Sequence, residues 1–242
     1  MAIDRDSVGT EAAAGIGSDF AGMINFLVDP RGAANRLPRK FFWIAPLVVV
    51  SIVFLVCGLY NLPLAQQAMM NQPPPPNMPV EQFQKGMQIG LLIQKISIYL
   101  APVLFVVFTG IAALVLFGSA SATAVQAKFL QLFNLMAGLS LIGALQIIAT
   151  SVIIHLKGEP SSLTDLQPAL GLDIFAPADM NKVAVAVLGF FNVFQVWQIV
   201  MAIAIVAIFY RIGKLKATVV VAPLFLLGLL FKIIGAYFSK TA

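Results

Sequence analysis

Few side chains in this sequence are placed where they could perform acid–base or metal chemistry. All ten acidic residues lie outside the apolar runs: five in the N-terminal 40 residues, Glu81 in one loop, and four between Gly158 and Lys182. The single histidine, His155, has no second histidine or cysteine near it, and the single cysteine, Cys57, lies within an apolar run. Zinc sites need several such ligands at set spacings, and buried carboxylates usually mark proton- or cation-coupled pathways. With no nucleotide-binding or nucleophile motif either, we expect no enzyme activity, no metal and no cofactor.

The polar side chains within the apolar runs are neutral. Two groups stand out, one near position 195 and one in an earlier run: Asn192, Gln195, Trp197 and Gln198, and Asn134 with Gln146. Asn192, Gln195 and Gln198 recur every three residues, so they lie along one side of a helix. An unpaired amide in hydrocarbon is costly, so both groups should face protein or water. They are candidates for helix packing through hydrogen bonds, for a partner-binding face, or for the lining of a polar permeation path.

These residues belong to a chain with the composition of an all-α integral membrane protein. Of its 242 residues 60% are hydrophobic and only 10% are charged, whereas soluble domains carry about 25% charged residues. One uncharged run, Val183 to Tyr210, has 28 residues, and a helix needs only about 20 to cross the hydrocarbon core. The apolar runs predict five transmembrane helices, at about 41–60, 96–117, 130–154, 183–210 and 217–239.

The N-terminal 40 residues precede these predicted spans. Residues 1–17 lack a continuous apolar run and predict a flexible tail. In residues 18–40, Ser18 can cap a helix in which Phe20, Met23, Ile24 and Leu27 recur at helical spacing, followed by a basic linker. This predicts an amphipathic helix at the membrane interface. The alternative is an ordinary helix packed on the protein itself.

Two loops that we expect on the outer side of the membrane have distinct compositions. Asn61 to Pro79 contains the run Pro73 to Pro76, which predicts an extended spacer, and Glu81 to Lys95 predicts a helix that lies mostly outside the bilayer. The second loop, Gly158 to Lys182, is acidic and is expected to be partly structured, with Ser162 and Asp165 spaced as in a capping box.

The distribution of lysine and arginine predicts the orientation in the membrane. With the N-terminus inside, nine of the basic residues lie in cytoplasmic segments and five in outer segments. Short loops rich in these residues stay in the cytoplasm, so the N-terminus is expected inside and the C-terminus outside. The basic residues cluster beside apolar runs and favour anionic lipid over nucleic acid as partner; the expected lipid contacts are Arg36, Arg39, Lys40, Arg211, Lys214 and Lys216.

Two stretches carry a resemblance to a known family. These are FLVDPRGAANRL, beginning at Phe26, and NVFQVWQIVMAIAIVAIFYRIGKLKA, beginning at Asn192, in which Phe194 and Trp197 form an F-x-x-W pattern. With five predicted spans, the chain resembles bacterial members of the Yip (Ypt-interacting-protein, Yip-one domain) family from about Phe20 to Tyr237. The resemblance implies a five-span bundle without catalytic residues, in the inner membrane of a bacterium.

The family suggests where to look for a function. Its bacterial members resemble accessory subunits of MacB-type ABC exporters, so we expect a non-enzymatic accessory or scaffold protein that binds other membrane proteins in a hetero-complex or homo-oligomer. One alternative is an oligomeric channel or transporter for a small solute. Another is a GTPase-binding trafficking factor, the role of eukaryotic members, although the long N-terminal region of those members is missing here.

Overall fold

The computed structural model describes residues 16–71, 79–158, 160, 166, 168–177 and 179–238. Within them the secondary structure is helical apart from one isolated antiparallel bridge between Gly171 and Asn192. The helices in chain order are α1 (Ile16–Met23), α2 (Asn25–Val28), α3 (Pro30–Ala34), α4 (Ile44–Met70), α5 (Val80–Ala122), α6 (Phe129–Lys157), the 3-10 helix η4 (Leu172–Phe175), α7 (Lys182–Phe190), α8 (Val193–Phe209) and α9 (Lys214–Phe238). The poly-proline run and the expected capping box at Ser162 lie outside the described residues.

Four of the described helices are long and apolar enough to cross a bilayer, namely α4, α5, α6 and α9. The expected all-α fold is therefore confirmed for the described residues, and the four helices agree with a multi-pass membrane protein. The predicted single helix over 183–210 is wrong, because the chain forms α7 and α8 with a break at Phe191 and Asn192. Helix α8 alone has 17 residues, about 25 Å, so the fifth span stays a prediction.

The break follows from local backbone and side-chain geometry. Asn192 has an extended backbone (φ −91°, ψ 165°), and its side-chain oxygen accepts a hydrogen bond from the backbone N–H of Gln195 at 2.9 Å. Asparagine in this position satisfies an amide that a new helix leaves unpaired. The apolar run is thus continuous in composition but starts a second helix at Asn192.

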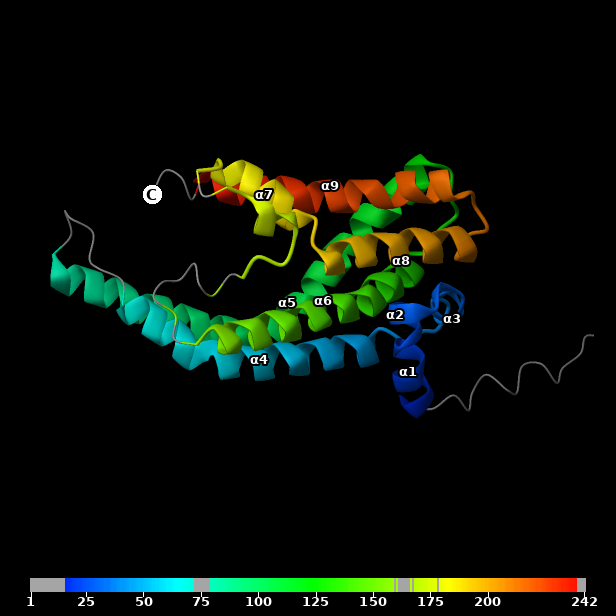
Figure 1. Cartoon of the computed structure of the whole chain (residues 1–242). Helices are drawn as coiled ribbons and strands as arrows, with labels where there is room; N and C mark the ends of the chain where they lie inside the picture. Colours follow the sequence, from blue (N-terminus) through cyan, green and yellow to red (C-terminus); the bar gives the residue numbers. More distant parts are fainter. Residues whose placement is uncertain are drawn as a thin grey trace, which may run out of the picture.

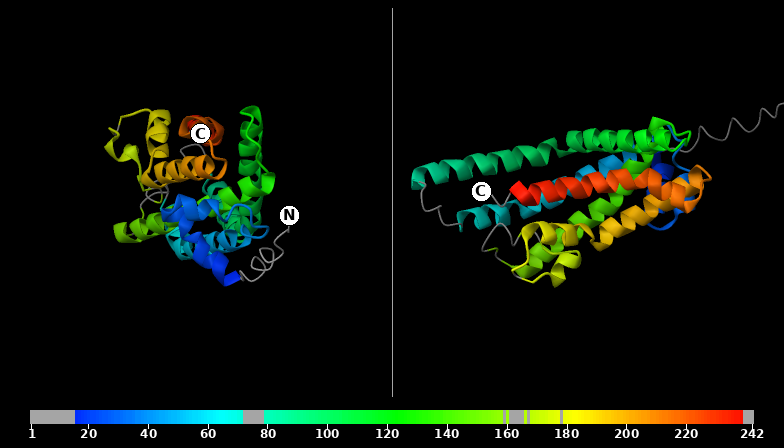
Figure 2. Two further views of the ribbon diagram at one scale, coloured as in Figure 1. Left: turned by 90° about the vertical axis from the view of Figure 1, so that its right-hand side faces the viewer. Right: turned by 90° about the horizontal axis from the view of Figure 1, so that it is seen from above.

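Helix α6 is the centre of the bundle (Figures 1 and 2). It packs against α4, α5 and α8, and its side chains Leu132, Leu135, Leu139 and Ile142 are at most 1% exposed. Helix α9 packs on α5, α7 and α8. The turns between α5 and α6 and between α8 and α9 lie together with α1–α3 at one end of the bundle, which we call the basic end (Figure 1); the other end is the distal end.

Helices α4 and α5 extend beyond the predicted spans and form a projecting hairpin at the distal end (Figure 2). Residues 61–70 are helical, contrary to the extended spacer expected there, and 80–95 form the expected helix, continuous with the span that follows. Helix α5 has 43 residues, about 64 Å in length, roughly twice the thickness of the hydrocarbon core. Part of this helix must therefore lie outside the hydrocarbon.

The N-terminal helices α1–α3 lie against the basic end. Phe26 is fully buried, stacks on Phe42 with ring centroids 5.2 Å apart, and contacts Gly138 of α6. Helix α1 begins at Ile16, so the expected helix start at Ser18 is two residues late. The packing agrees with the alternative of a helix folded onto the protein itself. The side chains of Phe20, Ile24 and Val28 are 41 to 71% exposed. The location of these exposed side chains at the membrane interface stays a prediction.

Candidate functional site: a polar cavity at the helix break

Asn134, one of the predicted polar residues, joins the N-terminal segment to the bundle. It is fully buried on α6. Its amide donates hydrogen bonds to the backbone oxygens of Leu37 at 2.9 Å and Arg39 at 2.6 Å, and its oxygen accepts one from the backbone N–H of Trp43 at 3.1 Å. All three partners belong to the segment that leads into α4, so this side chain holds the start of α4 against α6.

Three residues of the group on α8 also make structural contacts. The indole N–H of Trp197 donates to the backbone oxygen of Leu27 at 2.9 Å. Gln198 donates to the backbone oxygen of Leu139 at 3.3 Å and accepts from Gln195 at 3.5 Å. These contacts join α8 to α2 and α6, which is the helix-packing role among those expected from the sequence.

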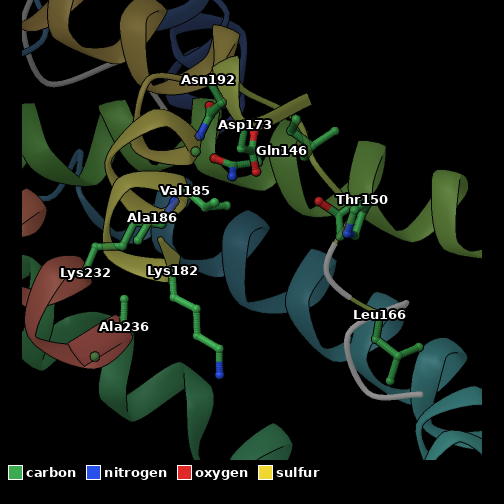
Figure 3. A pocket seen from close by; sticks show the side chains of 14 residues that line it. Gln146, Thr150, Leu166, Asp173, Lys182, Val185, Ala186, Asn192, Lys232 and Ala236 are labelled. Carbon is green, nitrogen blue, oxygen red and sulfur yellow. The ribbon is translucent and has the colours of Figure 1, made fainter. Parts of the chain in front are cut away.

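Asn192 and Gln146, the remaining two predicted residues, line a cavity of about 660 Å³ at the helix break (Figure 3). Volumes of 300–1,000 Å³ are typical of ligand pockets. The walls come from α6, α7, α9 and the segment around η4. Figure 3 shows Asn192, Asp173 and Gln146 gathered at one end of the cavity, while Lys182 extends at the other.

The cavity forms because α7 and α8, the two helices on either side of the break, pack against different helices. Helix α8 packs on α6, α9 and α3, whereas α7 packs chiefly on α9 and η4. The chain therefore turns away from α6 at Asn192 and opens a wedge between α6 and α7. In membrane proteins, backbone that departs from helical geometry is tolerated where it is buried in protein or lines a cavity. Asn192 meets both conditions, because it is 7% exposed and forms part of the cavity wall.

The segment before η4 is held against the break. Gly171 forms the bridge with Asn192, and a Cβ on Gly171 would lie 3.1 Å from the backbone oxygens of Leu188 and Phe191. Such a distance is tighter than ordinary van der Waals contact. A side chain at this position would therefore require the backbone of the break to move by a few tenths of an ångström. The carboxylate of Asp173 accepts a hydrogen bond from the N–H of Gly171 at 3.0 Å, which fixes both η4 and the carboxylate.

The charged groups of the cavity approach one another over Gly189. A Cβ on that glycine would lie 2.8 Å from a carboxylate oxygen of Asp173 and 3.4 Å from the ammonium nitrogen of Lys232. The two charged groups are thus no farther apart than the sum of these distances, and they attract each other. Among the described residues that line the cavity, the ionisable ones are Asp173, Lys182 and Lys232. Their formal charge is +1.

The cavity lies toward the distal end of the bundle. Asn192 and Gln146 lie about 26 Å from the basic ends of α8 and α6, and Lys232 lies about 27 Å along α9 from Lys214. The hydrocarbon core is about 30 Å thick. Lys182 begins α7 and is exposed, beyond that level. The cavity therefore lies at a distance from the basic end that is close to the thickness of the hydrocarbon core.

The predicted lipid-contact residues lie at the basic end, away from the cavity. Lys40, Arg211, Lys214 and Lys216 are exposed, and the ammonium of Lys40 lies 5.2 Å from the ring centroid of Phe41. Arg36 and Arg39 are half-buried and belong to the packed N-terminal segment. Their contact with lipid stays a prediction.

Sequence reasoning missed the charged residues of the cavity. Asp173 and Lys182 were placed in a loop, and Lys232 lay within a predicted span where its ammonium could reach the interface. The signal that could have found the cavity was Asn192 followed by Gln195, a helix-start pattern within an apolar run. His155 lies outside the cavity: it stacks on Tyr60 with centroids 4.0 Å apart, and its Nδ1 lies 3.0 Å from the backbone oxygen of Ser151.

Comparison with known proteins gives no relative: no family model, no curated protein and no solved structure matches the chain.

Proposed function

We propose that this chain is a non-enzymatic, multi-pass membrane protein that acts as an accessory or scaffold subunit of a larger membrane assembly. The resemblance to bacterial Yip-family proteins makes an ABC exporter of the MacB type the first partner to test, in a bacterial inner membrane. The polar side chains of the spans support the role, because Asn134, Trp197 and Gln198 are engaged in hydrogen bonds that hold the bundle together.

One observation carries this proposal: the projecting hairpin exposes a continuous apolar ridge on α5. The ridge consists of Ile89, Leu92, Ile96 and Tyr99, which are 53 to 60% exposed. Their spacing of three, four and three residues puts them on one side of the helix, as in the seam of a coiled coil. The side of α5 toward α4 is formed by other residues, including Gly90 near Met69.

Lipid chains cannot cover the outer part of this ridge. Ile89 lies about 50 Å along α5 from Ala122 at the basic end, beyond a bilayer of roughly 40–45 Å including headgroups. Leu92, at about 45 Å, lies at the outer edge of such a bilayer. Exposed apolar ridges in water mark interaction sites. A helical segment of another membrane protein with its own apolar face is the partner that fits, because a helix places apolar residues at the same spacing.

The test is affinity purification from mild detergent, with mass identification of bound proteins. We expect a second membrane protein in fixed ratio with the wild-type chain. The double variant Ile89→Ser and Leu92→Ser should lose it, whereas Leu156→Ser should keep it, because Leu156 is 82% exposed at the same end but lies on α6. A chain that emerges alone and monodisperse in every preparation would contradict the accessory role.

A second candidate, an oligomeric channel or transporter for a small solute, is favoured by the broken helix. Discontinuous helices with a polar cavity at the break are a feature of transporter sites. Purified protein in liposomes should then move solute, and Gln146→Leu in the wall of the cavity should abolish the flux while the thermal stability of the bundle stays unchanged. The accessory role would be favoured if no solute in a panel of small solutes were transported and the purification recovered a partner in fixed ratio.

A further inference from the structure

We propose that the projecting hairpin of α4 and α5 binds a soft monovalent cation of the Cu(I) class through the thioether sulfurs of Met69, Met70 and Met87. The site lies at the distal end, apart from the cavity at the helix break. This assignment is independent of the accessory role, because it uses none of the residues of the α5 ridge.

Methionine is concentrated in this hairpin. Four of the nine methionines of the sequence fall between positions 69 and 87, namely Met69, Met70, Met78 and Met87. Met78 lies outside the described residues. The other three line one pocket of about 170 Å³ between the end of α4 and the start of α5, together with Gln84, Gln88 and Leu91. Three thioethers from two helices therefore border the same space.

The two helices approach closely at this pocket (Figure 2). On α5 the lining residues are spaced by three, one and three positions from Gln84 to Leu91, so they share the side of the helix that faces α4. A Cβ on Gly90 would lie 4.0 Å from the terminal methyl carbon of Met69. Methionine is unbranched and has three rotatable bonds, so these side chains can turn their sulfurs toward one ion.

Packing alone does not account for these methionines. Methionine usually fills gaps in a core, but Met70 is 68% exposed, and space remains between it and the other two. Met87 lies about 53 Å along α5 from Ala122 at the basic end, beyond a bilayer of roughly 40–45 Å including headgroups. Lipid chains therefore do not cover the thioethers either.

The chemistry of the lining selects the class of cation. Thioethers are neutral, soft ligands, which favour Cu(I). Among the described residues that line the pocket none is ionisable, so Ca²⁺ and Mg²⁺ would find no carboxylate there. The expectation of no metal rested on histidine, cysteine and carboxylates, and the described residues contain no cluster of three such ligands. Thioethers form a separate ligand class.

The experiment titrates the full chain with Ag(I), a soft monovalent cation that does not need a reductant. Cys57 is replaced by alanine, because its thiol is the other soft ligand of the chain. Calorimetry in detergent should give one Ag(I) per chain, and the ¹³C-methyl NMR signals of Met69, Met70 and Met87 should shift. Cu(I) kept reduced with ascorbate should displace Ag(I), whereas Zn²⁺ should not bind.

Methionine-to-leucine variants separate ligation from packing, because this exchange conserves side-chain volume. Met87→Leu should weaken Ag(I) binding at least about tenfold, since loss of a mere outer-shell partner already costs about 10–100-fold in metal affinity. The triple variant Met69→Leu, Met70→Leu and Met87→Leu should abolish it. Met136→Leu with Met180→Leu is the matched control, because both residues are half-buried and lie outside the hairpin. Equal unfolding midpoints without metal would show that every variant is folded.

The outcomes decide the proposal. It would be overturned if the Cys57→Ala chain bound no Ag(I), if the triple variant kept its binding, or if the control lost as much. Shifts of all methionine signals together would indicate unspecific binding and would overturn it too. Binding of Zn²⁺ as tight as that of Ag(I), or failure of Cu(I) to displace Ag(I), would contradict the selection of a soft monovalent cation.

Discussion

Buried amides in a membrane bundle matter through the backbone groups they satisfy. Asn134 serves three such groups around the entry into α4, whereas Gln198 serves one, at Leu139. Leaving a buried polar group unpaired costs about 1–3 kcal/mol. The number of backbone partners should therefore determine how much each of these two residues contributes to stability. In the sequence, both residues are simply neutral polar side chains in apolar runs.

The first prediction uses this ranking. Asn134→Leu should lower the free energy of unfolding by about 2–4 kcal/mol and loosen the N-terminal segment, because Leu37, Arg39 and Trp43 lose their partner. Gln198→Leu should cost less than half as much. Chemical unfolding in detergent and the rate of tryptic cleavage at Arg36 and Arg39 measure the two effects. Equal costs for the two variants would contradict the role of Asn134.

A second residue-scale prediction concerns Gly138, where the ring of Phe26 occupies the space of a side chain. Gly138→Val should force Phe26 out of its site and destabilise the protein by about 1–3 kcal/mol, the usual cost of overpacking. Gly143→Val is the matched control, because Gly143 lies on the same helix and a Cβ added there would meet nothing within 4 Å. Unfolding midpoints of the two variants provide the comparison, and a control as unstable as Gly138→Val would refute the argument.

At the scale of elements, the sequence predicted where apolar helices occur better than where they end. The limits of α6 and α9 differ by only a few residues from the predicted spans. The predicted span ended too early because the segment from Asn61 was grouped with the proline run Pro73 to Pro76. The Leu, Ala, Gln and Met residues that follow Asn61 favour helix and continue α4 to Met70. Composition alone could not reveal the break at Asn192, since both sides of it are equally apolar.

The break depends on an approach between segments distant in sequence, which gives the third prediction. Gly171→Val should push η4 away from the break, because a side chain there meets the backbone oxygens of Leu188 and Phe191. The amides of Leu172–Phe175 should then exchange hydrogen at least about tenfold faster. Gly213→Val at the basic end has nothing within 4 Å and should leave this exchange unchanged. Unchanged protection in Gly171→Val would show that the segment is held by other contacts.

At the scale of the whole molecule, the structure shows which turns lie at the same end of the bundle. The α5–α6 and α8–α9 turns lie together with α1–α3, and the hairpin and the cavity lie toward the opposite end (Figure 1). If α7 and α8 cross the bilayer together, their combined length supplies the fifth crossing that α8 is too short to make alone. With five crossings, Lys182 and Lys216 lie on opposite sides of the membrane. If α7 and α8 do not cross, both lysines lie on the same side.

The fourth prediction therefore concerns cysteine accessibility. Cys57 is the only native cysteine, so single cysteines can be introduced into a Cys57→Ala chain at the exposed positions Gln84, Lys182 and Lys216. With the lysine and arginine bias placing the basic end in the cytoplasm, an impermeant maleimide should label Gln84→Cys and Lys182→Cys on intact cells. It should label Lys216→Cys only after permeabilisation. Equal labelling at Lys182 and Lys216 would mean that α7 and α8 do not cross, whereas the reverse pattern would invert the orientation but keep the five crossings.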